Sequence, residues 1–576
     1  MIATDYIALY LERRGVAQVF ELVGGMITFL LDSLHQKTGI QIISMHHEQG
    51  AAFAAEGAGR MTGIPGVAMA TSGPGATNLL TAIGSCYFDS TPTVFITGQV
   101  NTYEQKGQLA VRQLGFQETD IVSMARPITK AVWQINDASE IPERLEEAFN
   151  LATEGRPGPV LLDIPMDIQR AAITDLSRLT IDVPSAPKPP SDAASIAIWE
   201  QMLDSLHQSK RPLVLAGGGI RSGAATELFR DLVHALDVPV VHSLMAVDVL
   251  PAADPLRVGM IGSYGNRWAN IAISECDFLL VLGSRLDVRQ TGADTESFKG
   301  QRTIYHIDCE AGEMNNRVKN CHTHISELRP FLATALERTG PPIQNQSWLK
   351  QIQDSKATWP DTDELKDLQS INPNVLMHLI STHSAQAVAY VVDVGQHQMW
   401  AAQSLQLDVG QRFLTSGGMG AMGFALPTAI GAALAAGGKP VVVIAGDGGI
   451  QLNIQELQTI RRLNLPVKII ILNNHCHGMV RQFQESYFDE RYQSTLWGYS
   501  APSFHSVAAA YGIPSRQVAS PDLLNTALDE CWQNAESPFL LEVMIDSTVN
   551  AYPKMAFGRP ISEMEPLAQP TAMEST

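Results

Sequence analysis

The feature that most constrains the fold is a pattern that occurs three times: a continuously apolar run, a glycine-rich turn and a longer helical stretch. The three examples are GVAMATSGPGATN, RPLVLAGGGIRSG and KPVVVIAGDGGIQLNIQELQTIRRLNLPVKIIILNN. Strands that are apolar on both faces and alternate with helices are typical of parallel sheets covered by helices on both sides. The sequence therefore predicts an α/β protein built from three Rossmann-like parallel-sheet domains.

Two polar segments rich in proline divide this pattern into blocks. The first, TIDVPSAPKPPSD, runs from Thr180 to Asp192, and the second runs from about Gly340 to Pro373. A chain of 576 residues is long enough for three or four domains of about 150 residues each. We expect domains at 1–180, 190–340 and 370–550, followed by a C-terminal tail at 551–576.

Charge and composition exclude several classes of protein. Lys and Arg number 40 and Asp and Glu 59, so the formal charge is −19, which disfavours nucleic acids and anionic membranes as partners. No apolar run approaches the roughly 18 residues that a membrane-spanning helix needs. The cysteines show no CxxC pair, which favours free thiols in a reducing compartment. We expect a cytoplasmic protein without nucleic-acid or membrane partners.

The third block ends two neighbouring predicted strands in polar residues. The strand Val441–Ala445 leads to Gly446 and Asp447, and the strand Val467–Leu472 leads to Asn474. Because adjacent parallel strands end at one edge of a sheet, Asp447 and Asn474 are expected to lie together there. Carboxylate and amide oxygens suit Mg²⁺. Gly448 and Gly449 would let backbone N–H groups approach a phosphate at the start of the following helix.

A GDG turn followed by NN at the next strand end resembles the signature of thiamin diphosphate (ThDP) enzymes, and the similarity extends from about Ile2 to Pro566. The segments DVGQHQMWAAQ and TSGGMGAMGFALPTAIGAA closely resemble those of acetolactate synthases. HHEQGAAFAAEGAGR resembles the segment of the activating glutamate, which makes Glu48 the candidate for that residue. The resemblance further implies a bulky Met422 beneath the cofactor, a pyrimidine contact from the Gly420 backbone, a third Mg²⁺ oxygen from the Cys476 carbonyl, and diphosphate contacts from Gly395, Gln396 and His397.

Four segments of the middle block, AGGGIRSG, GMIGSYGN, LGSRLDVRQTG and HIDCE, resemble the FAD-binding segments of acetolactate synthases. In that family the flavin takes no redox part in the carbon–carbon bond formation. The resemblance implies a flavin site formed by Gly217, Gly218, Gly219, Arg285 and Asp308.

This sequence has only some of the residues that form the acceptor pocket in the family. Phe116, Gln117 and Arg289 match the family, and a guanidinium can hold an acceptor carboxylate with two hydrogen bonds. Phe483 stands where the family has tryptophan, and Met166 where it has lysine. Ser263-Tyr264 replaces a Met-His pair. These changes predict a remodelled acceptor pocket rather than a loss of the chemistry.

The resemblance implies a decarboxylating carboligase of the acetolactate synthase type, as in branched-chain amino acid biosynthesis. Pyruvate would give a hydroxyethyl-ThDP carbanion that adds to a 2-oxo acid, and pyruvate as acceptor would give 2-acetolactate. The alternatives are a flavin-containing carboligase acting on a keto sugar or other ketone, an FAD-dependent pyruvate oxidase, and an inactive regulatory paralogue. Because the family places its cofactor between two subunits, a homodimer or homotetramer is also implied.

Overall fold

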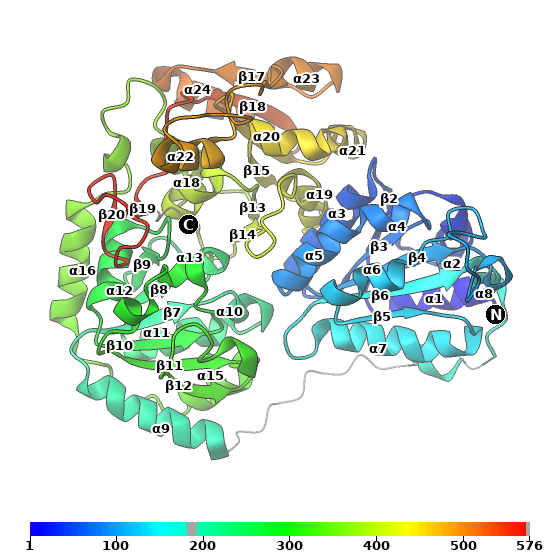
Figure 1. The fold of residues 1–576 in the computed structure, drawn as a ribbon, viewed down its shortest axis with the longest axis horizontal. Helices are drawn as coiled ribbons and strands as arrows, with labels where there is room; N and C mark the ends of the chain where they lie inside the picture. Colours follow the sequence, from blue (N-terminus) through cyan, green and yellow to red (C-terminus); the bar gives the residue numbers. More distant parts are fainter. Residues whose placement is uncertain (175, 181–192, 572–576) are drawn as a thin grey trace.

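The computed structural model describes residues 1–174, 176–180 and 193–571. It contains three six-stranded sheets in which every pair of neighbouring strands is parallel, with helices on both faces of each sheet (Figure 1). Alternate residues of one strand belong to different buried clusters: Val67 packs on one face of the first sheet and Ala68 on the other. The predicted fold class, three Rossmann-like parallel-sheet domains, is therefore confirmed.

The first sheet belongs to the N-terminal domain and has the strand order β2-β1-β3-β4-β6-β5. Its strands are β1 (Gln18–Leu22), β2 (Gln41–Ser44), β3 (Gly66–Ala70), β4 (Thr93–Gln99), β5 (Ala131–Gln134) and β6 (Pro159–Pro165). The helices used below are α3 (Glu48–Thr62), α4 (Pro74–Asn78), α5 (Leu80–Phe88) and α8 (Met166–Arg170).

The second sheet forms the central domain, in the order β12-β11-β10-β7-β8-β9. Its strands are β7 (Pro212–Ala216), β8 (Val240–His242), β9 (Arg257–Met260), β10 (Phe278–Leu282), β11 (Thr303–Asp308) and β12 (His322–Ile325). The helices that matter here are α12 (Arg267–Glu275), α13 (Val288–Thr291) and α16 (Gln346–Thr358).

The third sheet has the order β14-β13-β15-β16-β18-β17. Its strands are β13 (Ala389–Val392), β14 (Arg412–Thr415), β15 (Val441–Gly446), β16 (Val467–Asn473), β17 (Ser515–Val518) and β18 (Phe539–Met544). Helices α18 (Gln396–Ser404), α19 (Ala425–Ala435), α20 (Asp447–Ile450), α21 (Leu457–Leu463) and α22 (Gly478–Tyr487) follow its strands.

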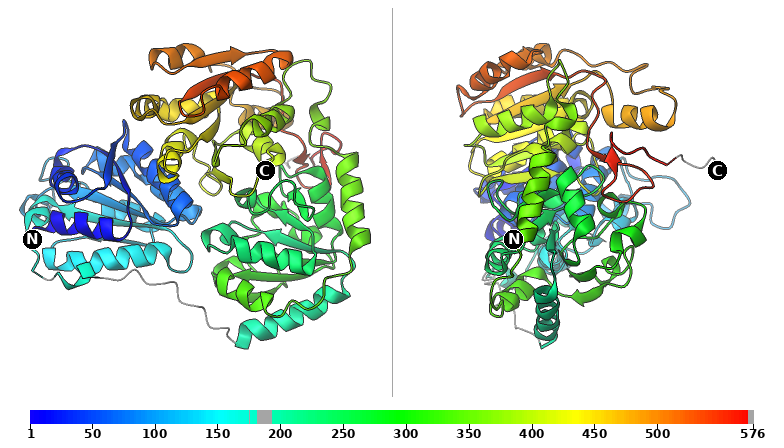
Figure 2. Two further views of the ribbon diagram at one scale, coloured as in Figure 1. Left: turned by 180° about the vertical axis from the view of Figure 1, so that it is seen from behind. Right: turned by 90° about the vertical axis from the view of Figure 1, so that its left-hand side faces the viewer.

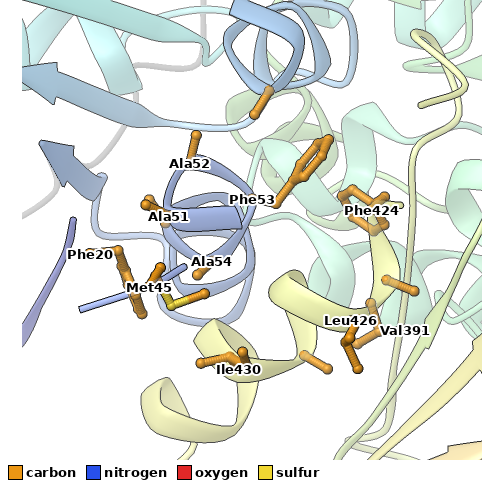
Figure 3. Packing of buried hydrophobic residues seen from close by; sticks show 14 of the residues in the cluster. Phe20, Met45, Ala51, Ala52, Phe53, Ala54, Val391, Phe424, Leu426 and Ile430 are labelled. Carbon is orange, nitrogen blue, oxygen red and sulfur yellow. The ribbon is translucent and has the colours of Figure 1, made fainter. Parts of the chain in front are cut away.

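The N-terminal and third domains meet where α3 packs against α19 (Figure 3). Both helices are rich in alanine and glycine, so their backbones approach closely. A Cβ atom on Gly57 would lie 2.3 Å from the carbonyl oxygen of Thr428, and one on Gly431 would lie 1.8 Å from that of Ala54. Phe53 and Phe424 pack edge to face beside this contact, with ring centroids 5.5 Å apart.

The two predicted linkers have different outcomes. Residues 181–192, nearly all of the first linker, lie outside the described residues. The second contains α16, whose Trp348 and Ile352 are buried against the central domain. We predicted a polar linker there because most positions of this helix are hydrophilic, and its few apolar residues did not stand out as a helical stripe.

The C-terminal tail packs against the central domain and α22. Its strands β19 (Lys554–Met555) and β20 (Met564–Glu565) form an antiparallel pair. The Met555 N–H donates a hydrogen bond to the Ser263 carbonyl at 2.7 Å, and Arg267 donates to the carbonyls of Met564 and Glu565. The side view of Figure 2 shows the red tail close to the orange helix α22.

Candidate active site

The carboxyl ends of β15 and β16 bring two of the predicted metal ligands to one edge of the third sheet. The strands pair in parallel register up to Gly446 and Leu472, so Asp447 and Asn474 directly follow neighbouring strands. Asp447 is buried, and its Oδ2 accepts a hydrogen bond from the Tyr499 hydroxyl at 3.0 Å. Burial raises the pKa of Asp447 to about 6, and a nearby cation would favour its charged form.

The donor set at this edge fits Mg²⁺. The Asn474 Oδ1 accepts the Cys476 N–H at 3.3 Å, so the chain turns here and places the backbone of Cys476 beside the amide. Among the described residues no three His, Cys, Asp or Glu side chains gather as a metal site. A site of one carboxylate, one amide oxygen and one backbone carbonyl leaves room for phosphate and water oxygens, as Mg²⁺ requires. Burial raises the pKa of the Cys476 thiol to about 11, so its sulfur stays protonated.

A compact turn lies at the start of α18, next to the strand end that carries Asp447. A Cβ on Gly395 would lie 2.5 Å from the His397 ring and would displace it, and one on Gly446 would lie 3.0 Å from the ring, a tight contact. Gln396 donates to the Val549 carbonyl at 3.1 Å. His397 is buried, and its Nε2 has no partner among the described residues. Burial lowers the pKa of His397 to about 3, so the ring is neutral and carries a single N–H.

The glycines of the GDG turn are similarly confined. A Cβ on Gly448 would lie 2.7 Å from the His477 ring and 3.4 Å from the Met422 Cε. A Cβ on Gly449 would lie 2.7 Å from the Asp393 carboxylate. Their backbones therefore lie against the side chains that line this edge, with no space for a larger residue.

The segment that carries Gly420 and Met422 connects β14 to α19. Gly420 has φ +66°, a left-handed conformation that favours glycine. The buried carboxylate of Asp393 accepts hydrogen bonds from the N–H groups of Gly423 and Ala425, both at 3.0 Å. Asp393 thus holds the end of the segment, a role that was not predicted although the residue opens the DVGQHQMWAAQ segment.

Glu48 begins α3 in the N-terminal domain and is buried. Its Oε2 accepts a hydrogen bond from Asn78 Nδ2 at 2.9 Å, and its other oxygen would lie 3.2 Å from a Cβ on Gly75. The structure therefore brings Glu48 together with the Thr71–Asn78 segment, TSGPGATN. Asn78 was not predicted as its partner, but it lies in GVAMATSGPGATN, one of the three examples of the repeated sequence pattern.

The start of α3 lies against the third domain of the same chain: Gln49, next to Glu48, accepts a hydrogen bond from Asn453 Nδ2 at 3.1 Å, and Asn453 also donates to the Gly423 carbonyl at 2.8 Å. Figure 1 shows α4 of the N-terminal domain well separated from α22 of the third domain. None of the hydrogen bonds between described residues joins Glu48, Phe116 or Gln117 to Met422 or Asp447. Phe116 is 80% exposed, which is unusual for a phenylalanine.

The predicted acceptor residues are likewise distributed over all three domains. Gln117 has φ +66° and packs near Gly73, whereas Met166 lies on α8 of the same domain. Phe483 lies on α22, 40% exposed, with its ring centroid 4.9 Å from that of Tyr487.

A cavity of about 720 Å³ lies between the central domain and the other two. Gly218, Gly219, Arg285 and Asp308 line it, and its size is typical of pockets for bound small molecules and cofactors. Gly217 lies behind the wall, where a Cβ would be 2.0 Å from the Gly283 carbonyl oxygen, so it shapes the turn instead of lining the space.

One end of this cavity carries three of the predicted acceptor residues. Arg289, Ser263 and Tyr264 line it, and the Ser263 N–H donates to the Arg289 carbonyl at 2.6 Å. The structure therefore groups Arg289 with the residues that replace the family's Met-His pair.

Comparison with known proteins matches each domain to a family model. Residues 1–124 match the N-terminal TPP binding domain of thiamine pyrophosphate enzymes, 199–334 the central domain, and 393–543 the C-terminal TPP binding domain. The chain belongs to the thiamine pyrophosphate enzyme family. It is accordingly a ThDP-dependent enzyme, and thiamine pyrophosphate is the same cofactor as ThDP.

Relatives within this family share the full length of the chain. It is 36% identical to the acetolactate synthase large subunit of Lactococcus lactis, over 96% of this chain and 94% of the relative. It is 36% identical to acetolactate synthase isozyme 2 large subunit of Escherichia coli, over 98% and 99%, and 35% identical to chloroplastic acetolactate synthase 2 of Nicotiana tabacum, over 96% and 84%. The predicted resemblance to acetolactate synthase large subunits is confirmed.

Among the described residues, no helix combines the length and apolar character needed to cross a membrane.

Proposed function

We propose that this enzyme is a Mg²⁺-dependent carboligase that decarboxylates pyruvate and transfers the remaining two-carbon unit to a second 2-oxo acid. With pyruvate as acceptor the product is 2-acetolactate. The single observation that carries this proposal is the near full-length similarity to proteins named acetolactate synthase large subunit. The intact set of Glu48, Asp447 and Asn474 supports it and disfavours an inactive regulatory paralogue.

The residues at the third-domain edge would hold the cofactor. Asp447, Asn474 and the Cys476 carbonyl would bind Mg²⁺, while Gly395, Gln396, His397, Gly448 and Gly449 would surround the diphosphate. When bound, ThDP supplies a carbon acid whose conjugate base adds to a ketone and stabilises the charge left after loss of CO₂.

The remaining roles belong to side chains that shape and protonate the site. The Glu48 carboxyl group, held by Asn78, would form a hydrogen bond with the pyrimidine ring, either as donor or as acceptor. In this way it would control whether the ring carries a proton. Met422 would fill the space beneath the cofactor, and the Gly420 carbonyl would accept a hydrogen bond from the pyrimidine amino group.

We further propose that a complete site needs two chains, because the ThDP enzymes that this chain resembles place their cofactor between two subunits. A homodimer or homotetramer would bring the N-terminal domain of one copy to the third domain of another. The strong exposure of Phe116 supports this arrangement. The relatives are named large subunits, which supports binding of a smaller subunit as well.

The cavity between the central domain and the other two would bind FAD, which would have no redox role. Gly218 and Gly219 would approach the pyrophosphate, Arg285 would add positive charge, and Asp308 would face the adenosine end. An FAD-dependent pyruvate oxidase is the alternative in which the flavin accepts electrons, and oxygen consumption separates the two. A cytoplasmic location stays a prediction of the sequence.

The acceptor is the least constrained part of the proposal. Arg289 would hold a carboxylate with two hydrogen bonds, and its place at the end of the cavity supports a 2-oxo acid. The second candidate, a keto sugar or other ketone, is favoured by Phe483, Met166 and the Ser263-Tyr264 pair, which alter the size and polarity of this region.

The test is product identification by NMR with ¹³C-labelled pyruvate, ThDP, Mg²⁺ and FAD. Rapid formation of 2-acetolactate without oxygen uptake is the expected result. Slow CO₂ release that a keto sugar accelerates would instead support the second candidate, and stoichiometric oxygen uptake would identify an oxidase. Light scattering of the holoenzyme tests the oligomer, and a fully active monomer would contradict the two-chain site.

A further inference from the structure

The segment 416–424, here called the cofactor loop, carries Gly420 and Met422 and is bound at its beginning by a residue of another domain. Asp89, at the end of α5 in the N-terminal domain of the same chain, accepts hydrogen bonds from two loop N–H groups. Its Oδ2 lies 3.0 Å from the Gly417 nitrogen, and its Oδ1 lies 2.6 Å from the Gly418 nitrogen. Both carboxylate oxygens are therefore used to fix the loop backbone.

Asp89 is itself held in place within the interface between domains. Its side chain is only 2% exposed, and Arg60 of α3 donates to its Oδ2 at 3.0 Å. Arg60 also pairs with the buried Glu56 at 2.5 Å and donates to the Thr415 carbonyl at 2.8 Å, directly before the loop. One charged group of three residues thus joins the N-terminal domain to the loop.

Further contacts from the N-terminal domain reach the same loop. The Ser85 and Ser416 hydroxyls lie 3.3 Å apart, and the Ser416 Oγ accepts the Ala421 N–H at 3.1 Å. The Arg60 guanidinium lies over the ring of Phe424, 5.3 Å from its centroid.

The sequence of the loop explains why it needs such support. SGGMGAMGF contains four glycines in nine residues, and glycine loses more conformational freedom on ordering than any other residue. Asp393 fixes only the end of the loop, at Gly423 and Ala425. The Asp89 hydrogen bonds at Gly417 and Gly418 add an anchor near the beginning of the loop, next to the bond between the Ser416 hydroxyl and the Ala421 N–H.

We propose that Asp89 is a positioning residue that, oriented by Arg60, fixes the cofactor loop so that Gly420 and Met422 meet the pyrimidine half of ThDP. The purpose of this positioning, contact with ThDP, rests on the proposed function. The hydrogen bonds from Asp89 to the loop do not depend on that function. Asp89 touches neither cofactor nor substrate in this role; it acts through the loop backbone.

The anchor gives each N-terminal domain two tasks. Helix α3 begins with Glu48 and carries Arg60 near its end, about 18 Å away at 1.5 Å per residue. In the proposed two-chain site, Glu48 serves the partner copy, whereas Arg60 and Asp89 order the cofactor loop of their own chain. One rigid helix therefore contributes to two active sites.

The experiment compares Asp89→Asn with the wild type and with Asp163→Asn as the matched control. Asp163 is another buried carboxylate of the N-terminal domain, bonded to Thr97, Gln99 and Gln134 and without a bond to the loop. Hydrogen–deuterium exchange of peptides covering 416–424 is measured without ThDP, and ThDP affinity is measured by titration at saturating Mg²⁺. Because Asp89, Gly417 and Gly418 also line the large cavity, FAD content is measured in every variant.

For Asp89→Asn we expect exchange in the cofactor loop to accelerate at least about tenfold and ThDP affinity to fall about 10- to 100-fold, since small misplacements of a site cost that much. FAD content is expected to match the wild type, and Asp89→Glu, which keeps the charge, should restore part of the affinity. Wild-type exchange and affinity in Asp89→Asn would overturn the inference, and so would equal changes in Asp163→Asn or a selective loss of FAD.

The inference also remains testable if Asp89→Asn does not fold. In the cofactor-free wild type, the peptide containing Gly417 and Gly418 is expected to exchange slowly, and rapid exchange there would contradict the anchor. A wild type that binds no ThDP would overturn the proposed function instead, because the exchange measurement uses no cofactor.

Discussion

The cofactor side and the acceptor side of the candidate site differ in how completely one chain builds them. On the cofactor side, Asp393, His397 and Asp447 are all buried, and glycines next to them leave no room for a side chain. On the acceptor side, Phe116 and Phe483 are exposed and distributed over two domains. The difference shows that one chain forms the part proposed to hold the cofactor as a closed, buried region, whereas the part proposed to select the acceptor is exposed.

The largest expected effect concerns Glu48, the residue that we place across the assembled interface. Glu48→Gln keeps the hydrogen bond with Asn78 possible but removes the ionisable proton, so kcat is expected to fall about 100- to 10,000-fold. ThDP affinity should change little, because Glu48 is not part of the diphosphate cradle. Steady-state kinetics and ThDP titration check this, and full turnover by the variant would require another base.

A substitution at the contact between α3 and α19 is expected to destabilise the cofactor side. In Gly431→Ala the new Cβ would lie 1.8 Å from the Ala54 carbonyl oxygen, so the helices must separate, at a cost of about 3 kcal/mol. Gly312→Ala is the control, because nothing lies within 4 Å of its added Cβ. Thermal inactivation at several scan rates measures both, and equal half-lives would contradict the tight contact.

Phe483→Trp tests the acceptor side, because it introduces the tryptophan that the family has at this position. A larger ring on α22 is expected to raise the preference for a 2-oxo acid acceptor over a keto sugar by about tenfold, within the range that one side chain supplies. The rate of CO₂ release from pyruvate should stay the same, because the donor half is built elsewhere. Competition experiments with both acceptors give the ratio, and a parallel fall in CO₂ release would mean that Phe483 also serves the donor step.

The smallest expected effect is a pH dependence of the free energy of unfolding, which arises from His397 on the cofactor side. The pKa of His397 is lowered to about 3, below the ordinary value of about 6.5 that it has in the unfolded chain. As the pH falls below about 6.5 the unfolded state takes up this proton and the folded state does not. The free energy of unfolding therefore decreases by up to about 1.4 kcal/mol per pH unit from this group.

Denaturation of the cofactor-free protein between pH 7.5 and 5.5 measures this slope. In His397→Asn the His397 part of the slope is expected to disappear, because asparagine does not titrate. An unchanged slope in the variant would show that the folded and unfolded states take up the His397 proton equally.

The sequence predicted those parts of the molecule that follow from local pattern. Apolar runs gave the strands, and strand ends located Asp447 and Asn474 because parallel strands end at a common edge. Asp393 and Asn78 lay within segments that were already singled out, but nothing local assigned their hydrogen bonds. Tyr499 could not be predicted, since it reaches Asp447 from a loop without periodicity.

Contacts between domains were beyond prediction for a different reason. Asp89 binds a loop more than three hundred positions further along the chain. The sequence around Asp89 is that of an ordinary helix end. The contact between the start of α3 and the third domain, such as that of Gln49 with Asn453, also depends on how whole domains pack. That packing results from many weak surface contacts and has no motif of its own.

The close approach of α3 and α19 has a consequence for how this protein can change over generations. Because Gly57 fits against the Thr428 carbonyl and Gly431 against that of Ala54, an enlarged residue on one helix demands a compensating change on the other, in a segment encoded far away. The two helices must therefore be inherited together. A chimaera that exchanges the N-terminal domain between distant relatives should fold only when α19 is exchanged with it.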